Sequence, residues 1–337
     1  MSCADILHRL YRLDDIGFVT ELYREFLDRE PEQGGLEGHL HLLRSGASRA
    51  QIAAGIAGSL ESIGKLEASE KPVITMSTLG SNGRFANQLF QYAFLRIYAK
   101  RHGLRVETPD WIGRHLFGAV DRPISNSWPT VSQRFDRPLE DGIPYATPPY
   151  QNVDFWGYFQ YHTSYYASDR DYFRSLFVPA PAIRQRLDPA VRLLDSLGKT
   201  VVGIHLRRGD YGSGYFFVTP SEWYKRWLAE LWPRLHAPVL FLASDELNRV
   251  RSDFSDFPTV TSRDLGIEMP EAEFYPDFYL LSRCDYTAIS NSTFSFAACM
   301  LNERGRQFVR PNPEIGTLIP FDPWNSEPLW RGNPTSV

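Results

Sequence analysis

A short apolar run at residues 201–206 gives way at once to polar and charged side chains. The run is rich in β-branched residues and lacks regular polar alternation, which predicts a buried parallel strand that includes His205. Arg207, Arg208 and Asp210 follow where that strand should end. In open α/β sheets, ligands bind outside the carboxyl ends of the strands. These side chains are therefore expected beside a ligand.

Two interpretations of this cluster remain open at the level of the residues. Adjacent arginines keep their charge and present planar forks of donors that suit phosphate oxygens, so Arg207 and Arg208 can form an anion clamp. The alternative is a surface salt-bridge cluster in which Asp210 braces an arginine. Arg208–Asp210 also matches an adhesion tripeptide, but matches this short are common by chance.

The first sixty residues show helical rather than strand periodicity. Asp14 or Asp15 can cap a helix with an apolar stripe, Gly34 and Gly35 interrupt the pattern, and Ser48 can cap a last helix. The stripe is expected to carry these residues: Ile16, Val19, Leu22, Tyr23, Phe26 and Leu27. We expect a helical module over 1–62 and a polar linker over 63–72.

A new pattern begins at residue 73, with a strand at 73–76, a glycine-rich turn at 80–84 and a helix at 85–102. A strand is expected at 104–107. The aromatic and proline-rich stretch that follows is harder to assign, although a helix is expected at 165–177. Residues 156–160 could form a sugar-stacking surface or simply pack as a strand or turn.

From residue 201 onward, apolar runs and amphipathic segments alternate, which predicts a parallel, doubly wound sheet. Strands are expected at 201–206, 239–243, 259–261, 286–290 and, as the last one, 307–310. Helices are expected at 221–235, around 278–281, and from 293 to about 303. Polar groups follow three of these strands: His205, Arg207 and Arg208; Asp245 and Glu246; Asn291, Ser292 and Thr293. Their convergence at one sheet edge predicts a nucleotide site.

Composition narrows the class of protein. The 337 residues are 43% hydrophobic with a net charge of −4, which supplies ordinary cores and argues against a general nucleic-acid binder. Cys3, Cys284 and Cys299 form no metal-binding pair and suggest free thiols in a reducing compartment. We expect a cytoplasmic protein without signal peptide or membrane span, with peripheral contact at the inner face of a membrane left open.

Four segments in the order 83–93, 157–160, 205–211 and 290–295 resemble the motifs of the α-1,2-fucosyltransferase family. The first resembles Gly-x-x-Gly-Asn-Gln-x-Phe-Gln-Tyr-Ala and the second Gly-Tyr-Phe-Gln. The third matches the family's donor motif, and the fourth resembles its C-terminal motif. Ala86 stands where the family usually has glycine, which leaves the acceptor more open than the donor.

The resemblance implies an α/β fold of two Rossmann-like lobes of the GT-B type, preceded here by the all-α module. We expect an acceptor-side lobe at 73–195 and a GDP-sugar-binding lobe at 196–337. The donor GDP-fucose would be bound without a metal or other cofactor, and fucose would pass with inversion to a galactosyl glycan. The residues expected to bind the donor are Asn87, His205, Arg207, Arg208, Asp245, Asn291, Ser292 and Thr293.

Within that resemblance, Arg207 and Arg208 would hold the pyrophosphate, while His205 and Asp245 would lie near guanine. Arg207, Arg208 and Asp210 are the expected catalytic residues. The general base is open between Asp210 and three carboxylates of the acceptor half, Asp110, Asp121 and Asp154. Other GDP-sugars, a peptide acceptor, or a non-catalytic glycan- or nucleotide-binding protein remain alternatives.

The N-terminal pattern has a resemblance of its own. Phe18-Val19-x-x-Leu22-Tyr23-Arg24, with the glycines and serines that follow, resembles an uncharacterised helical module of bacterial surface and glycan-related proteins. It implies no chemistry. Docking of residues 1–62 to a protein or to a membrane surface is the expected role, with simple decoration as the alternative.

Overall fold

The computed structural model describes residues 10–59, 61–62, 71–134, 142–214 and 216–331. The chain divides into two compact units, residues 1–72 and 73–337. Within the described segments, no helix has the length and apolar character needed to cross a bilayer.

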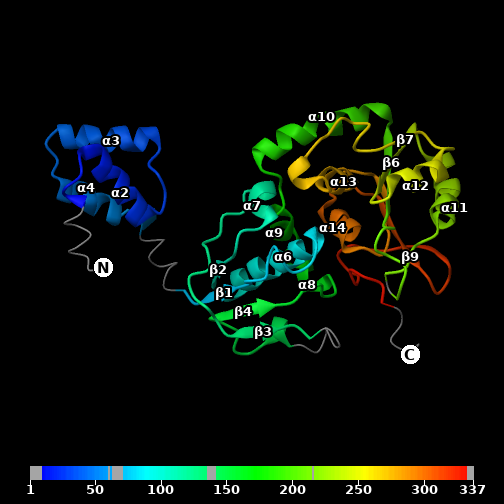
Figure 1. The fold of residues 1–337 in the computed structure, drawn as a ribbon, viewed down its shortest axis with the longest axis horizontal. Coiled ribbons are helices and arrows are strands. Elements are labelled where there is room, and N and C mark those ends of the chain that lie inside the picture. The colour runs from blue at the N-terminus through cyan, green and yellow to red at the C-terminus, as the bar shows by residue number, and fades with distance from the viewer. Residues whose placement is uncertain (1–9, 60, 63–70, 135–141, 215, 332–337) are drawn as a thin grey trace. The chain divides into compact units, whose positions relative to one another are not determined.

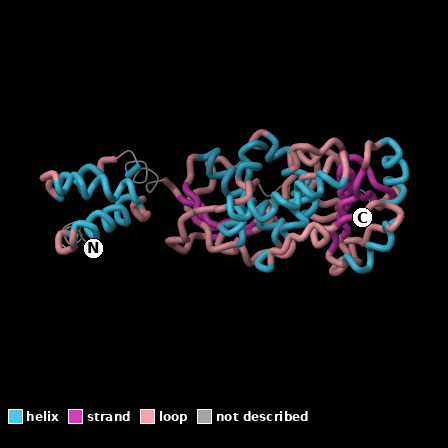
Figure 2. The backbone as a smooth tube through the Cα atoms, turned by 90° about the horizontal axis from the view of Figure 1, so that it is seen from above, coloured by secondary structure: helices cyan, strands magenta, loops and turns pink. Residues whose placement is uncertain are grey.

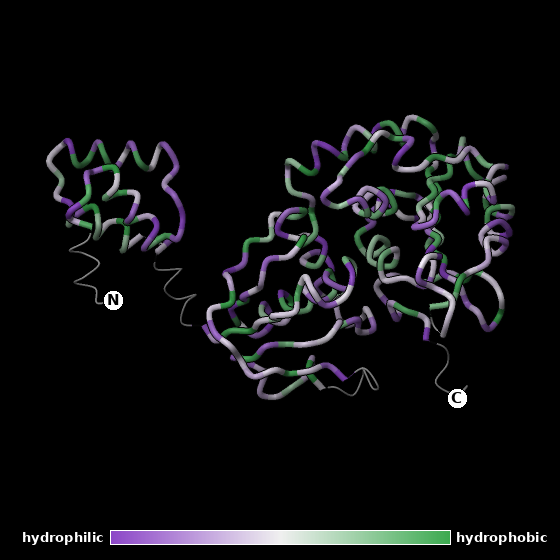
Figure 3. Tube along the Cα trace, in the orientation of Figure 1, coloured by the Kyte–Doolittle hydropathy of each residue, from purple (hydrophilic) through white to green (hydrophobic). Residues whose placement is uncertain are grey.

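The first unit consists of three described helices around a small apolar core (Figure 1). Asp14 caps the first by accepting a hydrogen bond from the Gly17 amide at 2.7 Å, and Ser48 caps the last in a reciprocal capping box with Gln51. Hydrophilic and hydrophobic positions alternate along these helices (Figure 3). The helices are α2 (Asp15–Leu27), α3 (Gln33–Arg44) and α4 (Arg49–Ala57).

Two details of the expected helical pattern are wrong. Ile16 does not belong to the buried stripe, because it lies in the first turn of α2 on the solvent side and is 55% exposed. Gly34 and Gly35 do not interrupt the second helix but form its first turn. A first turn needs no preceding helical hydrogen bonds, so glycine is tolerated there more easily than in a helix interior.

The second unit contains two sheets, seen as separate groups of strands with helices between them in Figure 2. The first has the order β2-β1-β4-β3 and is wholly parallel. Its strands are β1 (Val73–Thr75), β2 (Arg105–Glu107), β3 (Thr130–Ser132) and β4 (Val153–Trp156). Helices α6 (Phe85–His102) and α7 (Ile112–Phe117) follow β1 and β2.

The second sheet has the order β10-β9-β8-β5-β6-β7, and every neighbouring pair is parallel except β9 with β10. Its strands are β5 (Thr200–Leu206), β6 (Pro238–Ser244), β7 (Thr259–Val260), β8 (Tyr286–Ala288), β9 (Gln307–Asn312) and β10 (Thr317–Pro320). The expectation that the strand at 307–310 is the last one is wrong, because the chain turns at Gly316 and adds β10 to the sheet edge.

Helices connect these strands. They are α10 (Pro181–Leu197), α11 (Ser221–Leu231), α12 (Leu247–Val250), α13 (Tyr275–Leu281) and α14 (Thr293–Leu301). The single helix expected at 165–177 is two short ones, α8 (Ser164–Ala167) and α9 (Arg170–Ser175). Mixed α/β architecture with parallel sheets is therefore confirmed, while the lobe boundary at 195 stays a prediction and falls inside α10.

One hydrophobic core extends across both sheets of this unit. Phe85, at the first turn of α6, packs edge-on against Phe278 of α13 at a centroid distance of 5.0 Å and lies 4.7 Å from Phe274. Helix α6 also packs on α14. Because interiors are close-packed, this shared core fixes the turn before α6 against the carboxyl edge of the second sheet.

Gly83 in that turn has no room for a side chain. Its φ is +83°, and an added Cβ would lie 2.5 Å from Asn87 Nδ2 and 2.9 Å from Tyr158 Cε1. Gly118 shares the positive φ, at +67°, but its surroundings are open. The two glycines therefore separate backbone strain from steric clash.

We expect Gly83→Ala to lower stability by about 1–3 kcal/mol more than Gly118→Ala, since both add backbone strain but only the first overpacks. All eight tryptophans lie after residue 72, so tryptophan fluorescence monitors unfolding of this unit alone. Thermal midpoints of the two variants measured in this way provide the comparison. Equal midpoints would show that the space beside Gly83 can relax.

Candidate functional site

The carboxyl ends of β8, β5 and β6 lie side by side in the second sheet. Leu206 pairs with Ser244 and Ile204 pairs with Ala288, so these strands end close to one level. The residues that follow them are therefore neighbours, as the sequence predicted. Their side chains, however, have different partners.

Asp245 organises the loop that carries the two arginines. Its Oδ1 accepts a hydrogen bond from the Arg208 amide at 2.9 Å, and its Oδ2 accepts from the Gly209 amide at 2.9 Å. The same carboxylate lies 3.2 Å from Nε of Arg207. Asp245 was expected near guanine, but these three contacts make it first a structural support for the loop after β5.

Arg207 is neutralised by direct carboxylate partners. Besides Asp245, it has Asp210, whose Oδ1 lies 2.7 Å from an Arg207 terminal nitrogen. The Arg207 side chain is 20% exposed, and its guanidinium lies 5.9 Å from the Tyr211 ring centroid. A diphosphate bound by Arg207 would therefore compete with Asp210 for the same donors.

Arg208 differs in this respect. Its guanidinium donates to the Thr219 carbonyl and, at 3.0 Å, to the Ser221 hydroxyl. Over the described parts of the chain, no ion pair joins Arg208 to a carboxylate. A cation without an acidic partner is available for an anionic ligand, and this cation lines a cavity.

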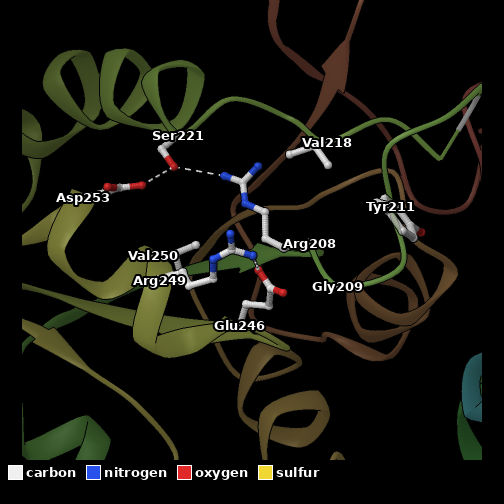
Figure 4. A pocket seen from close by; sticks show the side chains of 9 residues that line it. All are labelled: Arg208, Gly209, Tyr211, Val218, Ser221, Glu246, Arg249, Val250 and Asp253. Atoms are coloured by element: carbon white, nitrogen blue, oxygen red, sulfur yellow. Dashed lines mark hydrogen bonds and ion pairs between the residues drawn. The ribbon is translucent and has the colours of Figure 1, made fainter.

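That cavity has a volume of about 580 Å³, within the range of small-molecule sites. Figure 4 shows Arg208 extending between the start of α11 and the segment after β6. The lining residues are Arg208, Gly209, Tyr211, Val218, Ser221, Glu246, Arg249, Val250 and Asp253. The lining is therefore mainly polar, with two cations and two carboxylates beside the aliphatic side chains of Val218 and Val250, and Arg249 pairs with Glu246 at 2.7 Å.

His205 is a neutral, buried group beneath this edge. It is 4% exposed, its Nδ1 lies 3.0 Å from the Ser290 hydroxyl, and its ring lies 5.1 Å from that of Phe294. Burial lowers the His205 pKa from 6.5 to about 4. The imidazole is therefore uncharged near neutral pH and acts by packing and hydrogen bonding.

The three polar residues after β8 have different roles, and two of them, Asn291 and Ser292, make structural contacts. The Asn291 amide is occupied by the C-terminal segment, accepting from the Trp330 amide at 2.7 Å and donating to the Trp330 carbonyl at 2.9 Å. Ser292 caps α14 by accepting from the Phe294 amide at 3.3 Å. Direct donor contact through the Asn291 side chain is therefore not favoured by this geometry.

Thr293 makes the link to the first sheet. Its hydroxyl donates to Asn87 Oδ1 at 3.1 Å, and Gln160 donates to the same oxygen at 2.8 Å. Both bonds orient the Asn87 amide, so its Nδ2 group faces the other way. Of the expected sugar-stacking stretch, Trp156 is 38% exposed, whereas Phe159 is fully buried and packs in the core.

Two of the three acidic candidates of the acceptor half are engaged in other contacts. Asp121 is buried against Arg96. Asp154 accepts from the Ser77 amide at 2.7 Å and from the Ser77 hydroxyl at 2.6 Å. Asp110 is 84% exposed and lies 3.5 Å from Nε of Arg114 in α7. These contacts engage Asp121 and Asp154, so Asp110 is the one of the three whose carboxylate stays accessible.

Asp210 is the acidic candidate that lies at the site. Its side chain is 47% exposed and bridges Arg207 and, at 3.2 Å, Arg84 of the turn before α6. Its carboxylate therefore lies at the junction between the loop after β5 and the turn before α6. Among the described residues, no group of three His, Cys, Asp or Glu side chains is arranged to hold a metal ion.

Comparison with known proteins decides the family. The model of glycosyl transferase family 11 matches residues 47–312. The chain belongs to this family. A domain of unknown function, DUF4214, matches residues 7–66 and covers the first unit.

Among curated relatives, galactoside α-(1,2)-fucosyltransferase 1 of Leontocebus fuscicollis is 26% identical over 255 residues, covering 66% of this chain and 65% of its own. Galactoside α-(1,2)-fucosyltransferase 2 of Gorilla gorilla gorilla is 28% identical over 247 residues, covering 67% and 69%. The chain thus spans about two thirds of the length of the curated relatives it matches.

Among solved structures, NodZ α-1,6-fucosyltransferase soaked with GDP-fucose has a TM-score of 0.52 and 18% identity, covering 75% of this chain and 99% of its own. Fucosyltransferase NodZ from Bradyrhizobium gives a TM-score of 0.50 at 15% identity. Likeness at this identity shows the fold. The family 11 assignment agrees with the resemblance drawn from the four motifs.

Several cavity residues of this family 11 chain were missed from the sequence. Ser221 begins a helix and was expected only as part of its pattern, while Arg249, Val250 and Asp253 follow β6 at a distance. None stands directly at a strand end. No periodicity or motif signals that the segments meet around Arg208.

We expect Asp210→Asn to tighten the binding of a diphosphate at Arg207 about two- to fivefold, with GDP as the probe. The change removes a charge that competes with phosphate for Arg207 but keeps an acceptor for its N–H groups, and partly exposed ion pairs are worth roughly 0.2–1 kcal/mol. Isothermal titration calorimetry with GDP measures the dissociation constant. Weaker binding would mean that the carboxylate orients Arg207 rather than competing for it.

His205 makes stability depend on pH. Because burial depresses its pKa, the unfolded chain binds the proton more readily between about pH 4 and 6.5. The contribution of the neutral His205 to the free energy of unfolding is therefore fully present above pH 6.5. It is lost as pH falls toward 4, and the loss amounts to about 3 kcal/mol.

The measurement is urea unfolding followed by tryptophan fluorescence at several pH values. We expect His205→Gln to reduce the fall in stability between pH 6.5 and 4, whereas His236→Gln, an exposed position, should leave it unchanged. An unaltered slope in His205→Gln would show that the native state accommodates a charged imidazole.

Proposed function

We propose that the 73–337 unit transfers fucose from GDP-fucose to a galactosyl glycan, forming an α-1,2 linkage with inversion at the sugar carbon. The observation that carries the proposal is Arg208, a cation without a carboxylate partner among the described residues, lining a 580 Å³ cavity beside parallel strand ends. Family membership and the names of the curated relatives support donor and acceptor.

The chemistry needs charge stabilisation at the leaving group. An acceptor hydroxyl oxygen forms a bond to C1 of fucose, the bond from C1 to the β-phosphate oxygen breaks, and GDP leaves with the electron pair. Arg208 is placed to stabilise the charge that develops on that phosphate, and Arg207 adds a second fork once Asp210 releases it. Fixed guanidinium groups then perform the role that a metal ion has in other transferases.

The remaining side chains divide the other tasks. Glu246 can accept from the ring N–H and amine of guanine at the cavity wall, because carboxylates are acceptors only. Asn87, oriented by Gln160 and Thr293, lies where α6 meets the start of α14, and we place the entering acceptor at this junction. Asp210 is the proposed acceptor of the hydroxyl proton, since it pairs with Arg84 just before α6.

Products of incubation with GDP-fucose and a panel of galactose-terminated oligosaccharides, analysed by mass spectrometry and linkage analysis, test the proposal. We expect a single deoxyhexose added at the 2-hydroxyl of galactose. Transfer from another GDP-sugar or to a peptide would replace this assignment. GDP binding without any transfer would favour a non-catalytic binding protein.

Arg208→Ala should lower kcat/KM at least 100-fold, since removing one charge-stabilising donor typically costs this much. Arg234→Ala is the matched control, because Arg234 is exposed and is not one of the cavity-lining residues. Circular dichroism and the thermal midpoint establish that both variants fold. Full activity in Arg208→Ala would contradict the assignment of this cavity as the donor site.

A further inference from the structure

The Arg208 side chain is held by a hydrogen-bonded relay that ends in a carboxylate. One terminal nitrogen of Arg208 donates to the Ser221 hydroxyl at 3.0 Å. The Ser221 hydroxyl in turn donates to Asp253 Oδ2 at 2.6 Å. The dashed lines of Figure 4 trace both contacts.

The two residues that hold Arg208 come from different, firmly packed elements. Ser221 is the first residue of α11 and is 7% exposed. Asp253 lies in the 3₁₀ turn Arg251–Phe254, where Phe254 is fully buried and Val250 just before it is 3% exposed. Because packing fixes both segments, the Ser221 hydroxyl and the Asp253 carboxylate form a preorganised binding position for the Arg208 guanidinium.

The hydroxyl makes the arrangement chemically different from a direct ion pair. A serine hydroxyl has one proton, and donating it to Asp253 leaves its lone pairs for the Arg208 N–H. The Asp253 carboxylate thus orients Arg208 through the Ser221 hydroxyl and does not itself accept from the guanidinium N–H groups. Arg207 shows the contrast, because Asp210 and Asp245 occupy its donors directly.

We propose that Ser221 and Asp253 are positioning residues that hold the Arg208 guanidinium in the cavity for the diphosphate of the donor. The inference rests on the proposed function and adds to it the device that keeps one arginine oriented yet unpaired. The fixed orientation lowers the entropy that the side chain loses when phosphate binds, which favours affinity for GDP.

The alternative role for Asp253 is direct contact with the nucleotide, since it also lines the cavity. The two roles differ in how substitutions combine. Residues that act through one another give non-additive effects, whereas independent contacts add. A double-mutant cycle that combines Arg208→Ala with each of the other substitutions therefore distinguishes positioning from direct binding.

The experiment is calorimetric titration of the full-length chain with GDP for Ser221→Ala, Asp253→Asn and both together. We expect each single change to raise the dissociation constant for GDP about five- to tenfold. The double variant should bind GDP as tightly as the single variant that binds it less tightly. In an Arg208→Ala background, Ser221→Ala and Asp253→Asn should cause no further loss. Asp256→Asn, an exposed aspartate three residues on, is the matched control and should bind GDP normally.

Steady-state kinetics provide a second measurement, which would not change if Ser221 and Asp253 had only a structural role. We expect KM for GDP-fucose to rise with the dissociation constant while kcat falls by less, at an unchanged thermal midpoint. Additive losses, or losses that persist without Arg208, would overturn the relay. Two variants are used so that a fold defect in one does not decide the outcome.

The inference and the proposed function fail in distinguishable ways. If the unsubstituted protein neither binds GDP nor transfers fucose, the proposed function fails. If it does both, and Ser221→Ala and Asp253→Asn bind GDP as tightly as the unsubstituted protein, the relay alone is wrong.

Discussion

The site depends on one carboxylate, Asp245, which ties the end of β6 to the loop after β5. Hydrogen bonds from two successive amides at 2.9 Å fix the backbone at the point where the arginines leave the strand. Without this side-chain acceptor, both amides would need water or another partner at the strand end. Gly209 allows the close approach, since an added Cβ would lie 3.1 Å from Asp245 Oδ2.

Given this backbone, the two neighbouring arginines acquire different electrostatic surroundings. Adjacent residues in an extended segment point to opposite sides, so Arg207 meets Asp210 and Asp245, whereas Arg208 reaches toward α11. One arginine is paired and the other lines the cavity. Two neighbouring arginines therefore have different roles. Which of them can bind an anionic donor depends on the face of the loop that its side chain occupies.

The sequence predicted those parts of the site that follow directly from strand periodicity. Residues 201–206 form a strand because they are apolar and β-branched, and parallel topology then brings Arg208, Asp245 and Thr293 to one edge. It did not predict that Asn291 turns toward Trp330, because that contact joins the motif to a C-terminal segment without regular structure. Ser221 and Asp253 were missed for a similar physical reason: their meeting depends on how α11 and the turn after α12 pack, which no local pattern encodes.

The contact between Asn87 and Thr293 bears on how acceptor and donor are brought together. Phe85, two residues before Asn87, is packed among aromatic rings of α13, and α6 rests on α14 in the same core. Opening the two sheets apart would expose these rings and break the hydrogen bond at 3.1 Å, at a cost of several kcal/mol for the apolar area alone. The junction is therefore assembled before substrate arrives. Differences in acceptor choice within such a scaffold are then expected to come from the loops after β1, β3 and β4, and not from movement of one sheet against the other.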